Sequence, residues 1–323
     1  MRALITGGAG FIGSHLSERL LEQGYEVDVI DNLSTGRKRN ISHLFDNENF
    51  EFFQNTIMNE WLLEDLINQN DVVYHLAAAV GVKLIIEKPV ETIETNIRGT
   101  ENVLKYANKA RTKVLIASTS EVYGKLPHDL LGETDDRQYG PTTAHRWSYA
   151  ASKAIDEFLA LAYHKEYNLP VIIARLFNTV GPRQVGRYGM VLPNFVKQAI
   201  KNEPITIYGD GKQSRSFTYV GDCVSVLQGL MESEKAPGQV FNIGNSQEIS
   251  IEDLAKKVKE LSGSKSELKY IPYEEAYESG FEDMRRRCPD NSKITKLLGY
   301  KPSLSLDELI KITIDYNRQL MAT

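Results

Sequence analysis

Hydrophobic residues in the first half of the chain follow two periodicities in turn. Short runs of aliphatic and β-branched residues are typical of strands buried on both faces of a parallel sheet. Between the runs, apolar residues recur every three to four positions, which predicts amphipathic helices. The strands are expected at 3–6, 26–30, 50–54, 72–75, 114–118 and 171–176, and the helices at 11–23, 61–68, 92–110 and 149–167. The alternation predicts an α/β protein with a doubly wound parallel sheet.

The regular alternation ends near residue 178. Glycine and proline then mark turns, as in Gly181-Pro182 and Gly209-Asp210-Gly211. Shorter helices are expected at 193–202, 251–261 and 306–317. This pattern predicts a smaller mixed α/β lobe. We expect the sheet domain to comprise 1–178 plus about 216–245, and the lobe to comprise 179–215 and 246–323.

Composition excludes several classes of function. The chain has 323 residues, 41% of them hydrophobic, and a net charge of −5, so no overall field attracts nucleic acid. Nothing approaches the roughly 18 consecutive apolar residues of a membrane span. Cys223 and Cys288 form no C-x-x-C pair, so neither a disulfide framework nor a metal site is indicated. The first strand begins at once and leaves no room for a signal peptide, so we expect a cytoplasmic protein.

A glycine-rich loop joins the first strand to the first helix. Gly7, Gly10 and Gly13 allow the backbone to turn sharply and to approach a pyrophosphate at the helix N-terminus. Asp31 follows the second strand, where a carboxylate can bind both hydroxyls of an adenosine ribose and repels a 2′-phosphate. The loop therefore predicts NAD binding. The basic run 37–39 is the contrary signal, and we interpret it as a solvated loop.

Tyr149 and Lys153 are four residues apart at the start of the helix expected at 149–167. This spacing places both side chains on one helical face. A lysine ammonium favours the phenolate of a nearby tyrosine, so we expect the pKa of Tyr149 to fall below its reference value of about 10. The pair is then a candidate base for proton abstraction.

Several motifs, taken in order, give the chain a specific resemblance. It resembles the extended short-chain dehydrogenase/reductases, which have a Rossmann-type sheet, and among them the NAD-dependent nucleotide-sugar epimerases, dehydratases and decarboxylases. The motifs are G-x-x-G-x-x-G, Asp31-Asn32, His75-Leu76-Ala77-Ala78, Thr95-Asn96, Ser118-Thr119-Ser120, Tyr149-x-x-x-Lys153, 175–183, 207–211, 215–220 and 241–244. The match runs nearly from end to end.

The resemblance implies an NAD-binding Rossmann domain and a lobe that binds a nucleotide sugar. The implied cofactor-binding residues are Gly7, Gly10, Phe11, Ile12, Gly13, Asp31, Asn32, Ser34, Thr35, Gly36, Leu76, Ala77, Ala78, Asn96, Tyr149 and Lys153. Enzymes of this kind oxidise a sugar hydroxyl, usually at C4. The resemblance then makes Tyr149 the base, Lys153 its positive partner, and Thr119 the hydroxyl that binds the reacting oxygen.

Two residues after Thr119 bear on the type of reaction. Ser120 stands where many 4,6-dehydratases have an acidic residue, which makes that kind of dehydration a less favoured interpretation. Glu121 stands where dehydratases and UDP-glucuronate decarboxylases carry a glutamate beside C5 of the sugar. We include both residues in the candidate catalytic set.

The substrate-binding residues are also implied by resemblance. Arg287, two residues before Pro289-Asp290, matches an arginine that lies near the sugar carboxylate in decarboxylases and at the diphosphate in epimerases. Two arginines suit a diphosphate because each guanidinium can bind it through two hydrogen bonds. The candidate substrate-binding residues are Lys83, Asn178, Asn194, Tyr208, Arg215 and Arg287.

The sequence leaves the reaction open among related alternatives. The leading hypothesis is a UDP-glucuronate decarboxylase that works through a C4-keto sugar. The alternative is a UDP-hexose 4-epimerase, with a 4,6-dehydratase or a non-catalytic nucleotide-binding regulator less favoured. The resemblance also implies a homodimer formed through helices 92–110 and 149–167, with Ile155, Phe158, Leu159 and Ala162 facing either the partner or the sheet.

Overall fold

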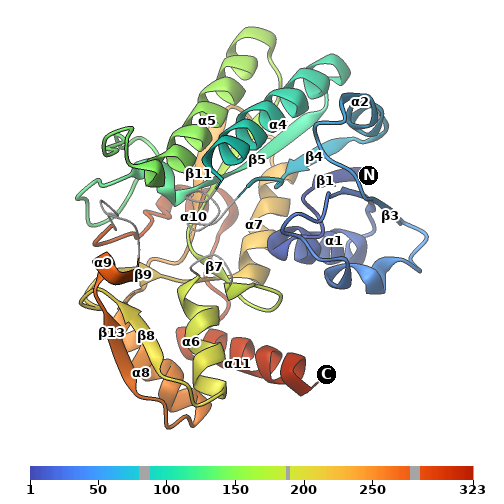
Figure 1. Ribbon diagram of the computed structural model, residues 1–323. Coiled ribbons are helices and arrows are strands. Elements are labelled where there is room, and N and C mark those ends of the chain that lie inside the picture. The colour runs from blue at the N-terminus through green and yellow to red at the C-terminus, as the bar shows by residue number, and fades with distance from the viewer. Residues whose placement is uncertain (80–87, 187–189, 277–283, 323) are drawn as a thin grey trace.

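The computed structural model describes residues 1–79, 88–186, 190–276 and 284–322. In those residues a seven-stranded sheet carries helices on both faces, and a smaller lobe lies at one end (Figure 1). The sheet strands are β1 (Arg2–Thr6), β2 (Glu26–Ile30), β3 (Phe50–Phe53), β4 (Val72–His75), β5 (Lys113–Thr119), β6 (Val171–Leu176) and β11 (Gln239–Ile243). The six strands expected from the sequence are confirmed to within a residue.

All neighbouring strands of the sheet run parallel, in the order β11-β6-β5-β4-β1-β2-β3. The chain winds outward from β1 to β3, returns to the other side of β1 as β4, and continues outward to β6. The order therefore reverses between β1 and β4. In doubly wound sheets, ligands bind beyond the carboxyl ends of the strands at this reversal.

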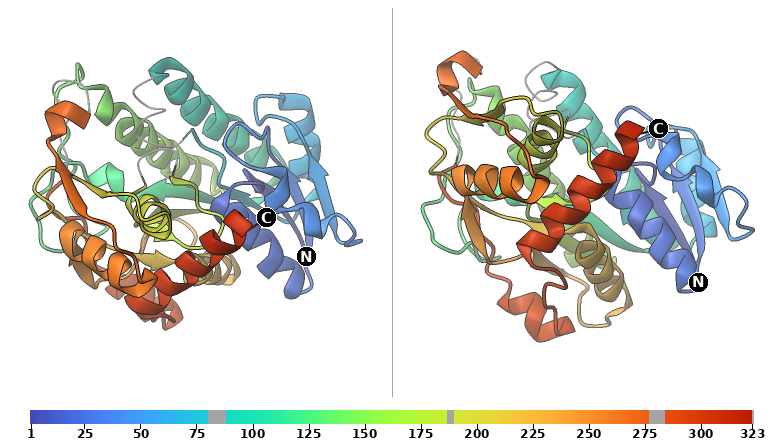
Figure 2. Two further views of the ribbon diagram at one scale, coloured as in Figure 1. Left: turned by 60° about the horizontal axis from the view of Figure 1, so that its bottom comes forward. Right: turned by 90° about the horizontal axis from the view of Figure 1, so that it is seen from below.

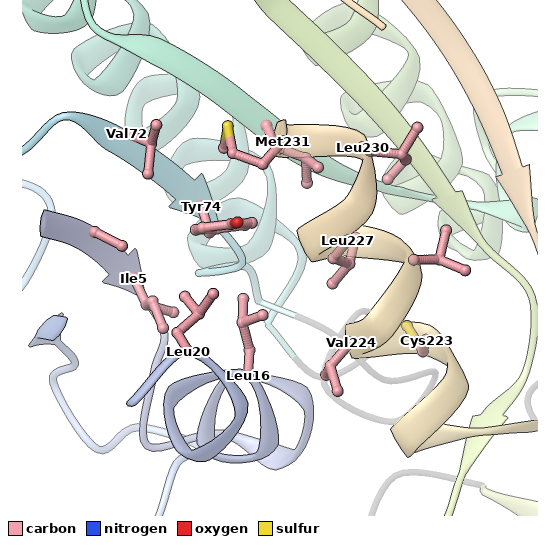
Figure 3. Packing of buried hydrophobic residues seen from close by; sticks show 14 of the residues in the cluster. Ile5, Leu16, Leu20, Val72, Tyr74, Cys223, Val224, Leu227, Leu230 and Met231 are labelled. Carbon is pink, nitrogen blue, oxygen red and sulfur yellow. The ribbon is translucent and has the colours of Figure 1, made fainter. Parts of the chain in front are cut away.

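One face of the sheet is covered by α1 (Phe11–Glu22) and α7 (Val220–Glu232). Figure 3 shows Leu16 and Leu20 of α1 next to Ile5 and Tyr74 of the sheet, with Leu227 of α7 packed on the same face of the sheet. These side chains are fully buried. Burying such a side chain is worth about 1.5–3 kcal/mol. This packing fixes the start of α1 beside the carboxyl end of β1.

The other face is covered by α2 (Glu60–Gln69), α4 (Pro89–Ala110) and α5 (Ser148–Tyr167). The four helices expected between the strands are thus confirmed, with α4 beginning three residues earlier than expected. The helices α4 and α5 lie side by side in the views of Figures 1 and 2. None of the helices in the described ranges is both long and apolar enough to span a bilayer.

The smaller lobe has its own core of buried aliphatic residues. Its elements are β8 (Ile205–Tyr208), β9 (Ser214–Ser216), β12 (Glu248–Ser250), β13 (Leu268–Ile271), α6 (Val191–Ile200), α8 (Ile251–Ser262), α9 (Tyr273–Ala276) and α11 (Leu306–Ala322). The short pair β7 (Thr179–Val180) and β10 (Thr218–Tyr219) joins the lobe to the sheet, and α10 (Ser292–Leu298) packs back on the sheet through Ile294. The division into an NAD-binding domain and a substrate-binding lobe stays a prediction.

A buried ion pair holds α5 against the sheet. Arg175 of β6 is 2% exposed, and its Nε and Nη2 donate to the two carboxylate oxygens of Glu157 on α5 at 2.9 and 2.8 Å. The Ser118 hydroxyl at the end of β5 donates to the same carboxylate at 2.5 Å. Nη1 of Arg175 donates to the Tyr123 hydroxyl at 2.8 Å, and Tyr123 donates to Asn242 of β11. The network therefore joins three neighbouring strands to the helix that carries Tyr149.

Replacing Arg175 with methionine should leave Glu157 as a poorly compensated buried charge. We expect the free energy of unfolding to fall by about 3–5 kcal/mol, measured by urea denaturation at pH 7. The matched control is Arg137→Met, because Arg137 donates to the same carboxylate at 2.8 Å but is 25% exposed. That variant should lose less than about 1 kcal/mol. Equal losses in the two variants would contradict the weight given to the buried pair.

Candidate active site

The glycine loop has the shape that a dinucleotide requires. Gly7 adopts a left-handed φ of +73°, and a Cβ there would lie 2.8 Å from the backbone nitrogen of Ala77. A Cβ on Gly13 would lie 2.4 Å from the carbonyl oxygen of Gly7. The first turn of α1 has no acidic residue and no side-chain cap, so its N–H groups are available to an anion. These features fit the pyrophosphate of a dinucleotide.

Asp31 anchors the loops on either side of it. Its Oδ2 accepts from the backbone N–H of Ala9 at 3.0 Å, and its Oδ1 accepts from that of Leu33 at 2.7 Å. Burial raises the pKa of this carboxyl, and the two backbone hydrogen bonds oppose the rise. A Cβ on Gly36 would lie 2.8 Å from Oδ2, so only glycine leaves the carboxylate accessible at that point. The surroundings of Asp31 fit a ribose with free hydroxyls.

Asn96 holds the segment after β4 in place. Its Oδ1 accepts from the backbone N–H of Ala79 at 2.8 Å, and its Nδ2 lies 3.3 Å from the Ser152 hydroxyl on α5. The side chain thus joins α4, α5 and the segment 76–79 that borders the strand reversal. Asn96 is buried, so in this arrangement it acts first as a support for the predicted cofactor-binding segment.

Thr119, Tyr149 and Lys153 meet at the carboxyl end of β5. Thr119 is the last residue of β5, and its hydroxyl hydrogen-bonds the phenol of Tyr149. Lys153 follows Tyr149 by one turn of α5, as the spacing predicted, and both side chains are buried. The fold therefore brings Thr119 to Tyr149 and places Lys153 on the same face of α5, where it pairs with Asp156. A hydroxyl, a phenol and an ammonium here can bind and deprotonate an alcohol.

The expectation of a lowered pKa for Tyr149 was wrong for the protein alone. Burial raises its pKa well above the ordinary value, and the negative charges of Glu121 and Asp156 raise it further. The Thr119 hydrogen bond and the Arg287 guanidinium lower it, but by less. Lys153 is also drawn to Asp156, because Nζ donates to its Oδ2 at 2.7 Å. A phenolate at Tyr149 therefore requires further positive charge or further hydrogen bonds.

Glu121 is clamped between two arginines. It lies in the 3₁₀ turn after β5, and Arg146 Nη1 donates to its Oε2 at 2.5 Å. Nη1 of Arg287 donates to its Oε1, and Nη2 of Arg287 donates to Oδ1 of Asn178 at 2.7 Å. Burial raises the pKa of Glu121, but the two guanidinium groups outweigh it and hold the value at about 2. Glu121 is therefore a carboxylate throughout the neutral range, and the cluster carries a net positive charge.

The other predicted substrate-binding residues within the described ranges lie in the lobe or where the chain passes from the sheet to the lobe. Asn178 adopts a φ of +24°, and its Nδ2 donates to the carbonyl of Ser216 at 2.9 Å. Arg215 is buried in β9, Asn194 lies in α6 and Tyr208 ends β8. Ser120 is buried in the turn that carries Glu121. Lys83 lies outside the described residues.

Two residues at this site were missed by the sequence reasoning. Arg146 stands in the turn just before α5, 6% exposed, and its role appears only when the fold places it against Glu121. Asp156 stands seven positions after Tyr149, a spacing of two helical turns that points to the same face. That spacing was a usable signal for Asp156, whereas Arg146 offered none.

Comparisons with known proteins agree with this geometry. The family described as GDP-mannose 4,6 dehydratase matches residues 4–313. Over 320 residues the chain is 43% identical to the UDP-N-acetyl-alpha-D-glucosaminuronate decarboxylase of Bacillus cytotoxicus, covering 99% of this chain and 98% of that protein. It is 41% identical over 320 residues to UDP-glucuronic acid decarboxylase 4 of Arabidopsis thaliana, covering 99% of this chain and 69% of that protein.

A solved structure of similar shape is the UDP-glucuronic acid 4-epimerase of Bacillus cereus in complex with UDP-glucuronic acid and NAD. The TM-score is 0.89 and the identity 33%, with 99% of this chain and 100% of the other covered. The chain belongs to the family of nucleotide-sugar enzymes whose model matches residues 4–313. The predicted membership among the extended short-chain dehydrogenase/reductases, and the predicted Rossmann-type fold, are thus confirmed.

The charge state assigned to Glu121 can be tested through the pH dependence of the free energy of unfolding. Its folded pKa lies below the ordinary value of 4.5, so its ion pairs stabilise the fold fully above about pH 4.5 and lose that effect as the pH falls toward 2. Glu121→Gln should lower the free energy of unfolding by about 3 kcal/mol at pH 7. The difference from wild type should shrink steadily between pH 4.5 and 3, measured by urea denaturation.

The control for this experiment is Glu60→Gln, which removes an exposed ion pair with Lys105. It should change the unfolding free energy little at any of these pH values. A loss in Glu121→Gln that stays constant from pH 7 to 3 would contradict the assigned charge state.

Proposed function

We propose that the chain is an NAD-dependent decarboxylase of a UDP-linked uronic acid, with UDP-glucuronate as the first substrate to test. The observation that carries the proposal is similarity along nearly the whole chain to UDP-uronate decarboxylases, at 38–43% identity, in a chain that places Glu121 between the buried Arg146 and the partly buried Arg287. The fit of the glycine loop and Asp31 to a dinucleotide supports NAD. A non-catalytic regulator would need neither Tyr149 nor Lys153 at the hydroxyl of Thr119.

In this proposal the chain's own residues handle the C4 hydroxyl of the sugar. Thr119 donates to the C4 oxygen and fixes its position, while Tyr149 takes the hydroxyl proton. Lys153 favours the phenolate and binds the ribose next to the nicotinamide. NAD held by these residues would supply a hydride acceptor for C4, the hydride that returns after decarboxylation, and a positive charge near Tyr149.

The ketone at C4 makes the carboxylate at C5 a leaving group. Loss of carbon dioxide from a carboxylate β to a ketone leaves an enolate, which the donors around C4 can stabilise. Arg146 and Arg287 give the surroundings a positive charge that attracts the sugar carboxylate or the diphosphate. Glu121 cannot serve as a proton donor at neutral pH, because it is a carboxylate, so we assign it to holding both arginines and the sugar ring.

The nucleotide half of the substrate is assigned to the lobe. Asn178, Asn194 and Tyr208 are proposed to contact the uridine and diphosphate, with Arg215 as a second phosphate ligand. Ser120 and Lys83 are proposed to contact the sugar. The cofactor residues are those of the glycine loop, of 31–36 and of 76–78, together with Asn96, Tyr149 and Lys153.

Two alternative outcomes are favoured by particular relatives. The Bacillus cytotoxicus enzyme is named for an N-acetylated uronate, so UDP-N-acetylglucosaminuronate is the second substrate to test. The Bacillus cereus structure is a 4-epimerase that holds UDP-glucuronic acid. An epimerase keeps the carboxylate and returns hydride to the opposite face of the sugar, so the products distinguish the two reactions.

Incubation with NAD and either UDP-uronate should release carbon dioxide and yield the UDP-sugar without its carboxyl group. Mass spectrometry detects the loss, and NMR assigns the C4 configuration. Tyr149→Phe is the control: it should bind NAD but turn over substrate at least about 100-fold more slowly. A product of unchanged mass with inverted C4 would replace decarboxylation by epimerisation.

We also propose that two copies associate through α4 and α5. Ile155 and Phe158 of α5 are 48% and 59% exposed, and Val90 and Ile93 of α4 are exposed as well. Leu159, by contrast, packs against the sheet-side core. These exposed apolar residues lie on two adjacent helices, the pair of helices through which the resemblance implies a dimer. A second copy presenting the same face would complete a four-helix bundle.

Phe158→Asp should shift the protein from dimer to monomer, because it places a charge in the proposed apolar interface. Light scattering coupled to size-exclusion chromatography measures the mass. Trp61→Asp is the control, since Trp61 is an exposed aromatic on α2 rather than on this face. A wild-type protein that is monomeric at micromolar concentration would refute the proposed interface.

A further inference from the structure

A carboxylate outside the predicted catalytic set lies on the catalytic face of α5. Asp156 follows Tyr149 by seven residues and Lys153 by three, so all three side chains lie on one side of the helix. Asp156 is fully buried and Lys153 is nearly so. Buried carboxylates are rare unless they are paired, so the presence of Asp156 here calls for a partner and a consequence.

Lys153 is that partner. Its Nζ donates to Oδ2 of Asp156 at 2.7 Å, and the two side chains are 3% and 1% exposed. The other oxygen, Oδ1, makes no hydrogen bond of normal geometry within the described residues. An ammonium has three donors. Asp156 therefore fixes one of them and leaves the remaining donors of Lys153 for other acceptors.

The surroundings of Asp156 come from two further elements. Burial raises the pKa of Asp156, and the Thr100 hydroxyl on α4 opposes that rise. Behind Thr100, the buried ring of His75 on β4 lies 3.2 Å from that hydroxyl. Burial lowers the pKa of His75 to about 3, so this ring is neutral. From α5 itself Glu157 opposes ionisation of Asp156 and Lys153 favours it. Among the described groups that act on Asp156, Lys153 is thus the one with a positive charge.

We propose that Asp156 is a positioning residue of the catalytic centre. Its carboxylate holds the ammonium of Lys153 in place and opposes the effect of that ammonium on the ionisation of Tyr149. The inference concerns the C4 oxidation step and rests on the proposed use of Tyr149 as the base. It does not depend on which UDP sugar is the substrate.

The charges that face Tyr149 determine the direction of the effect. Glu121 from the turn after β5 and Asp156 from α5 raise the pKa of Tyr149, whereas the Thr119 hydroxyl and the Arg287 guanidinium lower it. Neutralising Asp156 removes one of the two negative charges that act on Tyr149. The carboxylate of Asp156 then no longer offsets the favourable effect of the Lys153 ammonium on the phenolate. The pKa of Tyr149 then falls, and the base becomes active at lower pH.

The first test is Asp156→Asn, which keeps the shape of the side chain and an acceptor for Lys153. The acid limb of kcat/KM against pH, measured at saturating NAD, should move down by about one pH unit. The control is Asp222→Asn, a buried aspartate of α7 that accepts from the backbone of Ser303 at 3.0 Å. Its acid limb should match wild type. An acid limb of Asp156→Asn that is unchanged, or that moves to higher pH, overturns the proposal.

The second test uses NAD binding, which needs no sugar. Asp156→Ala removes the acceptor that seats Lys153, so NAD affinity measured by calorimetry at pH 7.5 should fall roughly three- to tenfold. Asp156→Asn should stay within about twofold of wild type, because its amide oxygen still accepts from Lys153. Wild-type affinity in the alanine variant would overturn the seating role.

The two readouts separate this inference from the proposed function. If neither UDP-uronate is decarboxylated, NAD affinity still decides the seating role. The pH limb can then be measured on whichever UDP sugar the wild-type protein oxidises at C4. If the alanine variant does not fold, the asparagine variant still provides the pH test. A Lys153→Met variant then gives the NAD affinity in the absence of the ammonium, and this affinity should be at least roughly three- to tenfold below that of wild type. Wild-type affinity in Lys153→Met would overturn the proposal.

Discussion

The buried ion pair between Glu157 and Arg175 is the interaction on which the arrangement of the site depends. It connects α5 to β6 directly, to β5 through Ser118, and to β11 through Tyr123 and Asn242. A helix packed by aliphatic contacts alone can slide by fractions of an ångström, whereas two parallel guanidinium–carboxylate hydrogen bonds fix its register. This register places Tyr149 at the hydroxyl of Thr119.

In the protein alone, the surroundings of Tyr149 disfavour its phenolate. Tyr149 is buried beside two carboxylates, and both of its potential positive partners already have anions: Lys153 binds Asp156, and Arg287 binds Glu121. This explains why the phenol is held in its neutral form. A cationic nicotinamide would change that balance from outside by adding positive charge, whereas an anionic UDP sugar that engages Arg287 would oppose the change, because Arg287 lowers the pKa of Tyr149.

Much of the architecture was predictable because it depends on local patterns. The strands 2–6 and 26–30 and the helix 148–167 are specified by hydrophobic periodicity within the segments themselves, and their bounds were found to within a residue or two. The glycine loop, Asp31 and the Tyr149–Lys153 pair are also short-range signals. Each has a spacing that a single chain displays without knowledge of the fold.

The charge environment could not be predicted in the same way. The sequence shows Lys153 one turn from Tyr149, but it does not show that Glu121, 28 positions earlier, faces the same phenol. Arg146 carries no pattern at all, and only the turn before α5 places it on Glu121. Burial and every charge within a few ångströms set a pKa, so the lowered value expected for Tyr149 from one neighbour had the wrong sign once the fold buried the phenol and placed two carboxylates near it.

We infer that the sugar is oxidised and reduced at the same C4 carbon while its carboxylate is lost. The most direct measurement follows UDP-glucuronate that carries deuterium at C4 through one complete turnover with NAD, using NMR of the product. We expect a UDP-pentose with the deuterium still bound at C4, because the hydride that leaves this carbon returns to it. A decarboxylated product with ordinary hydrogen at C4, or recovery of the labelled carboxylate sugar alone, would contradict it.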